Sequence, residues 1–179
     1  MQNELDVIRD IAEKFAQAGI EYMLTGSVAM NYYTQPRMTR DIDVVVSLRP
    51  KDVDIVTALF ESDYYVDRNA VSRAVANQSL FNIIHNAAFI KVDCIVRKNT
   101  EYRRLEFERR LEVTIQDVSV RIVSKEDLII SKLYWARDSH SEVQLRDVKN
   151  LLVSGYDDEY LEQSTRRLGL HDLLQECLI

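Results

Sequence analysis

The chain has 179 residues, 46% hydrophobic and 29% charged, a balance typical of one globular domain or of one domain with a small appendage. Its net charge of -6 argues against a protein that coats nucleic acid, and its two cysteines, Cys94 and Cys177, make neither a disulfide framework nor a thiolate metal site. Because the N-terminus has no apolar signal core and no apolar run approaches the ~20 residues that span a membrane, we expect a cytoplasmic protein without a membrane partner.

Helical and strand-like patterns are mixed through the first two-thirds of the chain. The spacing of apolar residues, together with Gly19 and Pro50 as end signals, predicts helices at 8–15, 28–33, 50–62, 69–77 and 101–110. Runs of β-branched and aromatic residues predict strands at 22–25 and 41–47, neighbouring strands at 79–85 and 88–96, and a hairpin from 112–115 and 118–123.

The last third of the chain is predicted to be helical. Ser124 and Asp127 form a plausible N-cap pair for the first of its helices. These helices are predicted at 125–137, 141–153, 157–169 and 171–179. We therefore expect an α/β domain over residues 1–123, followed by a helical region over 124–179 that packs on it.

Three aspartates stand in strands that are otherwise apolar. Side chains alternate along a strand, so Asp41 and Asp43 share one face while Ile42, Val44 and Val46 share the other. If the strand that contains Asp93 lies beside the first, three carboxylates converge, and such hard oxygen ligands suit Mg²⁺ shared with substrate phosphates. Lys91 shares the face of Asp93.

The competing interpretation is structural: Asp41 and Asp43 are solvated charges at a strand edge, and Asp93 pairs with Lys91 or an arginine. The Gly26-Ser27 turn upstream changes this balance. Glycine lets the backbone approach a ligand closely, amides at a helix start favour phosphate, and a serine hydroxyl can donate to a phosphate oxygen. A phosphate cradle followed by metal carboxylates matches the chemistry of nucleotidyl transfer.

With these residues the sequence resembles the DNA polymerase beta-like nucleotidyltransferase superfamily. Within it, residues 26–46 resemble the bacterial minimal nucleotidyltransferases, which are similar to abortive-infection (AbiE-type) nucleotidyltransferase toxins. The resemblance extends to a basic residue before the aspartates (Arg37 or Arg40), a later helical lysine (Lys132) and an Arg-Asp pair after it (Arg146 and Asp147). The fold that it implies is a mixed twisted sheet flanked by helices, with a C-terminal helical extension.

The resemblance also implies an activity. Asp41, Asp43 and Asp93 are expected to be catalytic and to bind Mg²⁺ or Mn²⁺, while a second group binds nucleotide phosphates. That second group consists of Gly26, Ser27, Arg40 and Lys132. NMP would pass from an NTP such as ATP to a hydroxyl of RNA or tRNA, a protein or a small molecule. A toxin–antitoxin role with a small partner protein is compatible with this prediction.

Several alternatives stay open. One alternative is a non-catalytic nucleotidyltransferase fold that binds a partner protein, although such a module has no need for three like charges. Another is a Mg²⁺-dependent phosphoesterase that uses the same carboxylates with water as the nucleophile. Lys132 lies on an apolar helix face, where it either reaches phosphate or extends its charge to solvent, and Asp147 is catalytic or pairs with Lys132 or Arg146. We expect Tyr64, Tyr65 and Trp135 to serve packing rather than to form a platform on which bases stack.

Overall fold

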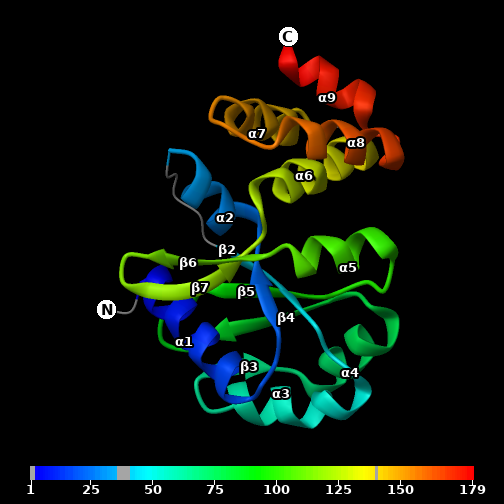
Figure 1. The fold of residues 1–179 in the computed structure, drawn as a ribbon. Helices are drawn as coiled ribbons and strands as arrows, with labels where there is room; N and C mark the ends of the chain where they lie inside the picture. The colour runs from blue at the N-terminus through cyan, green and yellow to red at the C-terminus, as the bar shows by residue number, and fades with distance from the viewer. Residues whose placement is uncertain (1–2, 36–40, 140) are drawn as a thin grey trace. The chain divides into compact units, whose positions relative to one another are not determined.

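Seven strands form one mixed sheet in the computed structural model, which describes residues 3–35, 41–139 and 141–179 (Figure 1). The strands are β1 (Tyr22–Leu24), β2 (Asp41–Val46), β3 (Tyr64–Val66), β4 (Leu80–His85), β5 (Lys91–Val96), β6 (Leu111–Ile115) and β7 (Val118–Ile122). Their order is β3-β4-β5-β2-β1-β7-β6. The pairs β2–β5 and β1–β7 are parallel, and the other neighbours are antiparallel. The mixed sheet with helices confirms the predicted fold class.

The chain divides into two compact units. The first contains Met1–Val28 and Arg37–Val123, and the second contains Ala29–Pro36 and Ser124–Ile179. The first unit holds the sheet together with α1 (Glu4–Gln17), the start of α2 (Gly26–Tyr33), η1 (Pro50–Asp52), α3 (Val53–Phe60), α4 (Arg68–Asn77) and α5 (Glu101–Glu108). The second holds α6 (Lys125–Ser139), α7 (Glu142–Leu152), α8 (Asp158–Leu168) and α9 (His171–Leu178).

One face of the sheet is the core of the first unit. Along β2 the side chains of Ile42, Val44 and Val46 are fully buried, as the alternation of the sequence predicted. A chain of aromatic contacts joins α1 and α3 to this layer: the ring centroids of Phe15 and Phe60 lie 5.4 Å apart, and those of Phe60 and Tyr64 lie 5.1 Å apart. The face that carries the aspartates is therefore the opposite one.

Local sequence signals account for two tight features. Gln116 and Asp117 both have positive φ, which is the backbone of the two-residue turn that closes the β6–β7 hairpin. At the start of α6, the Asp127 amide donates to Ser124 Oγ over 3.2 Å, and the Ser124 hydroxyl donates to Asp127 Oδ2 over 2.6 Å. Both agree with the predicted hairpin and N-cap.

The second unit is an assembly of helices in which α6 contacts α7, α8 and α9. A buried polar group links two of them. The Asp127 carboxylate, fully buried, also accepts a hydrogen bond of 2.8 Å from the Tyr160 hydroxyl on α8. Because a buried carboxylate is costly without partners, this bond fixes α8 against the start of α6.

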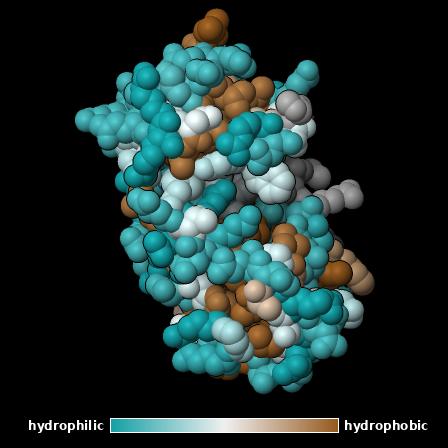
Figure 2. Space-filling model, turned by 90° about the vertical axis from the view of Figure 1, so that its right-hand side faces the viewer, coloured by the Kyte–Doolittle hydropathy of each residue, from teal (hydrophilic) through white to brown (hydrophobic). Residues whose placement is uncertain are grey.

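Two predictions about aromatic residues are wrong. Tyr64 is buried, but Tyr65 is 64% exposed and Trp135 is 63% exposed. Tyr65 lies in β3, a three-residue strand that was too short for its alternation to be recognised. The surface drawn in Figure 2 is mainly hydrophilic, with apolar patches between polar side chains. Among the described residues, none of the helices is both long and apolar enough to cross a membrane.

Candidate functional site

The three predicted aspartates meet on the face of the sheet opposite the buried side chains of β2. Strands β2 and β5 are parallel neighbours, and their register pairs Asp43 with Asp93 and Asp41 with Lys91. Because neighbouring strands lie about 4.8 Å apart and paired residues point to the same side, Asp43 and Asp93 project side by side. The condition set by the sequence, that the Asp93 strand lies beside the Asp41 strand, is met.

Lys91 lies between two of the carboxylates. Its Nζ atom is 3.1 Å from Asp93 Oδ2 and 3.8 Å from Asp41 Oδ1. The Lys91 pKa is raised, first by its hydrogen bond to Asp93 and then by the negative charges of Asp93, Asp41 and Asp43. This lysine therefore carries its positive charge inside the aspartate group.

Asn82 is a polar member of the site that the sequence did not reveal. It stands opposite Asp93 in the β4–β5 register, and its side-chain amide donates to Asp93 Oδ1. Asn82 and Lys91 thus engage the two oxygens of one carboxylate. The exact length of the β4–β5 turn sets this pairing, and a predicted turn near residues 85 and 86 does not fix it to the residue.

Gly26 is required by its contact with Asp43. Its φ of +56° lies in the left-handed region, and a Cβ atom placed on it would lie 2.0 Å from Asp43 Oδ2. The predicted use of this glycine was close approach of the backbone to a ligand. In the structure the close approach is to the carboxylate itself, which a side chain at position 26 would displace.

Ser27 joins the helix start to β2. Its hydroxyl donates to the backbone carbonyl of Asp41 over 3.1 Å, while the Thr25 amide donates to the Asp43 carbonyl over 2.9 Å. These bonds connect the end of β1 and the start of α2 to the strand of the aspartates. The helix start and the carboxylates therefore form one local assembly within the first unit.

The surroundings of Asp43 disfavour the ionised form of its carboxylate. Its pKa is raised, mainly by burial and next by the nearby charge of Asp93, while the Ser27 amide acts in the opposite direction. Asp93 is also largely enclosed, with 16% of its side chain exposed, whereas Asp41 is 53% exposed. A cation that joins this group would relieve the repulsion between Asp43 and Asp93.

The residues suit a divalent cation in their chemistry and charge. Asp41, Asp43 and Asp93 offer hard oxygen ligands on one face, and the position between Asp41 and Asp93 already contains a positive charge, that of Lys91. As the side chains stand, no three acidic, histidine or cysteine residues within the described ranges converge closely enough to hold a metal ion. Metal binding therefore requires these side chains to turn, and Lys91 to move away.

Two further phosphate ligands were predicted, Arg40 and Lys132. Arg40 is outside the described residues. In the second unit, Lys132 Nζ lies 2.7 Å from Asp147 Oδ2 and donates to Gln144 Oε1 over 3.2 Å. Lys132 and Asp147 are both buried, at 6% and 3% exposure, so Lys132 does not extend its charge to solvent. This ion pair is one of the pairings that the sequence left open for Asp147.

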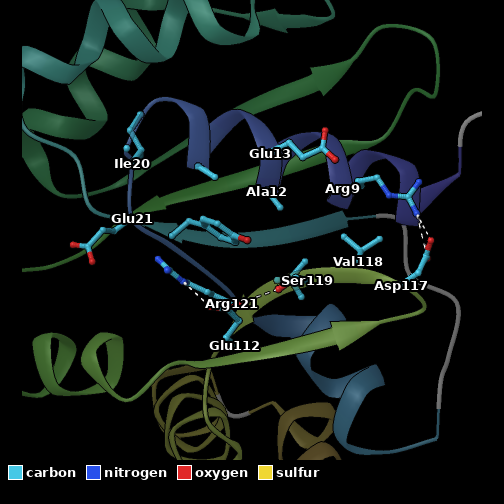
Figure 3. A pocket seen from close by; sticks show the side chains of 14 residues that line it. Arg9, Ala12, Glu13, Ile20, Glu21, Glu112, Asp117, Val118, Ser119 and Arg121 are labelled. Carbon is cyan, nitrogen blue, oxygen red and sulfur yellow. Dashed lines mark hydrogen bonds and ion pairs between the residues drawn. The ribbon is translucent and has the colours of Figure 1, made fainter.

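A pocket of about 530 Å³ lies away from the aspartates (Figure 3). It is lined by α1, β1 and the β6–β7 hairpin, and the Arg9–Asp117 ion pair of 3.3 Å lies at one end. Its lining includes none of Asp41, Asp43 and Asp93.

The same architecture occurs in solved structures of nucleotidyltransferases. An antigenic nucleotidyltransferase-like protein from Paracoccidioides brasiliensis is 17% identical, with a TM-score of 0.59 over 94% of this chain and 90% of that chain. The lincosamide antibiotic adenylyltransferase LnuA, in a lincomycin-bound structure, is 17% identical, with a TM-score of 0.55 over 83% and 96%. ANT(2")-Ia, in complex with adenylyl-2"-tobramycin, is 12% identical, with a TM-score of 0.56 over 98% and 97%.

These likenesses establish that the chain has the nucleotidyltransferase fold. No family model matches the sequence, and no curated protein matches it. The similarity is one of backbone architecture.

Proposed function

We propose that this protein is a metal-dependent nucleotidyltransferase that transfers NMP from an NTP to an acceptor hydroxyl. The observation that carries the proposal is the register of β2 and β5, which places Asp43 beside Asp93 and Asp41 beside Lys91. The fold shared with antibiotic adenylyltransferases adds support at the level of architecture. A partner-binding protein would have no use for the repulsion between Asp43 and Asp93.

In this proposal, Asp41, Asp43 and Asp93 hold Mg²⁺ or Mn²⁺. The bound cation supplies charge neutralisation for the triphosphate and for the oxygen atoms that attack and leave. The protein residues do the positioning. The Ser27 amide donates a hydrogen bond to the Asp43 carboxylate. Gly26, which has no side chain, leaves the space that this carboxylate occupies.

The start of α2 would receive the phosphates beyond the α-phosphate. The Gly26 and Ser27 amides open this helix, and amides at such a position favour negative charge. The Ser27 hydroxyl now donates to the Asp41 carbonyl, so a role in phosphate binding requires it to turn. Arg40 and Lys132 remain proposed phosphate ligands, and for Lys132 that role requires release from Asp147.

The proposed reaction is a single displacement at the α-phosphorus of the NTP. The acceptor oxygen forms a bond to the α-phosphorus, the bond from that phosphorus to the bridging oxygen breaks, and pyrophosphate leaves. Asp93 would help to activate the acceptor hydroxyl and accept its proton, because it stands beside Asp43 on the neighbouring strand. The acceptor is a small molecule, a protein hydroxyl or RNA such as tRNA, and a toxin–antitoxin role is one setting for the last two.

The test follows two labels. The protein is incubated with Mg²⁺ or Mn²⁺, each NTP labelled at the α- or γ-phosphate, and three acceptor pools: aminoglycoside and lincosamide antibiotics, bulk tRNA, and cell lysate. We expect α-label on an acceptor and γ-label in pyrophosphate, both absent in Asp43→Asn. Free γ-phosphate without a labelled acceptor would instead indicate a phosphoesterase, and no turnover with any pool would favour the partner-binding alternative.

A further inference from the structure

The positive charge inside the aspartate group comes from the chain itself. Lys91 Nζ lies within hydrogen-bonding distance of Asp93 Oδ2, at 3.1 Å, and 3.8 Å from Asp41 Oδ1. The register of β2 and β5 pairs Lys91 directly with Asp41, and Lys91 precedes Asp93 by two residues on the same face. The backbone therefore delivers an ammonium group to the place where the proposed cation must bind.

We propose that Lys91 is a tethered counter-ion that occupies the metal position in the metal-free protein and is displaced when a divalent cation binds. This inference rests on the proposed function, because it concerns the same carboxylates. Asp41 and Asp93 cannot serve both cations fully, since each oxygen that turns to the metal weakens its contact with Lys91. Lys91 thereby sets the affinity of the site for metal.

The surroundings of Lys91 permit such an exchange. Its side chain is 42% exposed, so the ammonium can move into water at little desolvation cost. Asp93, in contrast, also accepts a hydrogen bond at its other oxygen from the Asn82 amide, a contact that does not involve Lys91. Lys91 is thus the exchangeable partner of Asp93, and Asn82 is its neutral hydrogen-bond donor.

The exchange also explains how the aspartates are tolerated without metal. Asp43 and Asp93 repel each other, and the Lys91 charge acts on all three aspartates of the group. Without the Lys91 charge, the repulsion between Asp43 and Asp93 would lower the stability of the metal-free fold further. We therefore expect Lys91 to stabilise the metal-free protein and to weaken metal binding, two effects with one cause.

The expected size follows from the two ion-pair contacts that Lys91 makes with Asp41 and Asp93, both of which metal binding must break. Removal of the charge should therefore tighten metal binding roughly tenfold, which is the change that about 1.4 kcal/mol produces.

The experiment titrates Mn²⁺ alone into the full chain, without nucleotide, by calorimetry at fixed pH and ionic strength. Lys91→Met removes the charge, Lys91→Arg keeps it, and Lys51→Met removes an exposed lysine from η1 as a matched control. We expect a dissociation constant about tenfold lower for Lys91→Met than for the wild type, and little change for Lys91→Arg and Lys51→Met. Thermal unfolding gives a second readout: Lys91→Met unfolds at a lower temperature without Mn²⁺ and gains more than the wild type when Mn²⁺ is added.

The outcomes separate the two proposals. Equal or weaker Mn²⁺ binding by Lys91→Met, beside clear binding by the wild type, overturns the counter-ion role and leaves the nucleotidyltransferase proposal standing. Absence of Mn²⁺ binding in every variant overturns both. Should Lys91→Met fail to fold, as judged by circular dichroism, Lys91→Gln carries the same comparison.

Discussion

Gly26→Ala is the most informative substitution in the candidate site, because the Gly26 backbone lies against the Asp43 carboxylate. The new methyl group would lie 2.0 Å from Asp43 Oδ2 and 2.7 Å from Asp43 Cγ, far inside ordinary van der Waals contact. Alanine must also adopt the left-handed φ of +56°, for which it pays about 1–2 kcal/mol. We expect the Asp43 carboxylate to be pushed from its place.

The chain contains a matched control for the backbone part of this cost. Gly19 has nearly the same φ, +63°, but a Cβ there would meet nothing within 4 Å. Gly19→Ala should therefore lower the free energy of unfolding by about 1–2 kcal/mol through φ alone. Gly26→Ala should lose a further ~1–3 kcal/mol, the usual cost of forcing extra atoms into a packed site.

The assay measures both variants by urea denaturation and by transfer of α-label from NTP. A catalytic carboxylate moved by about 1 Å costs on the order of a hundredfold in rate, so Gly26→Ala should lose activity while Gly19→Ala keeps it. Equal losses of stability and equal activity in the two variants would refute the reasoning, because they would mean that the Gly26–Asp43 contact has no consequence.

Three further predictions concern charged and buried groups. Burial raises the pKa of Asp43, so its ionised form lowers the free energy of unfolding above that pKa, and this loss disappears as the pH falls through it. Asp43→Asn should therefore melt at a higher temperature than the wild type at neutral pH, and the difference between the two melting temperatures should close in acid. A difference independent of pH would contradict this. Lys132→Met removes the cation of a buried ion pair and should cost about 3–5 kcal/mol in denaturant unfolding. Much of this loss should be recovered when Lys132→Met is combined with Asp147→Leu; additive losses would refute the pairing. Tyr160→Phe removes the donor to Asp127 and should cost about 1–3 kcal/mol by the same measurement, so an unchanged unfolding midpoint would show that this bond contributes nothing.

The sequence predicted most elements of the sheet because its strands alternate in a clear way. Ile42, Val44 and Val46 define one buried face, so the side on which Asp41 and Asp43 stand could be predicted without a structure. β3 was missed because three residues are too few to show alternation. The wrong prediction for Tyr65 has the same origin, because the side to which Tyr65 points depends on that strand.

The candidate site was harder to predict where it depends on register. Asp93 beside Asp43 needed only that β5 neighbours β2, but the contacts of Lys91 and Asn82 with Asp93 need the pairing exact to one residue. The contact of Gly26 with Asp43 depends on where β1 ends relative to β2, which no local pattern encodes. The burial of Lys132 against Asp147 similarly results from the packing of α6 on α7.

Metal-dependent nucleotide binding tests the central claim most directly. A non-hydrolysable NTP analogue is titrated calorimetrically into the wild type with Mg²⁺, into the wild type with chelator, and into Asp43→Asn with Mg²⁺. We predict binding in the first case and a loss of at least about tenfold in affinity in the other two, since each removes the link between carboxylates and phosphates. Equal binding in all three, or no binding in any, would contradict the account.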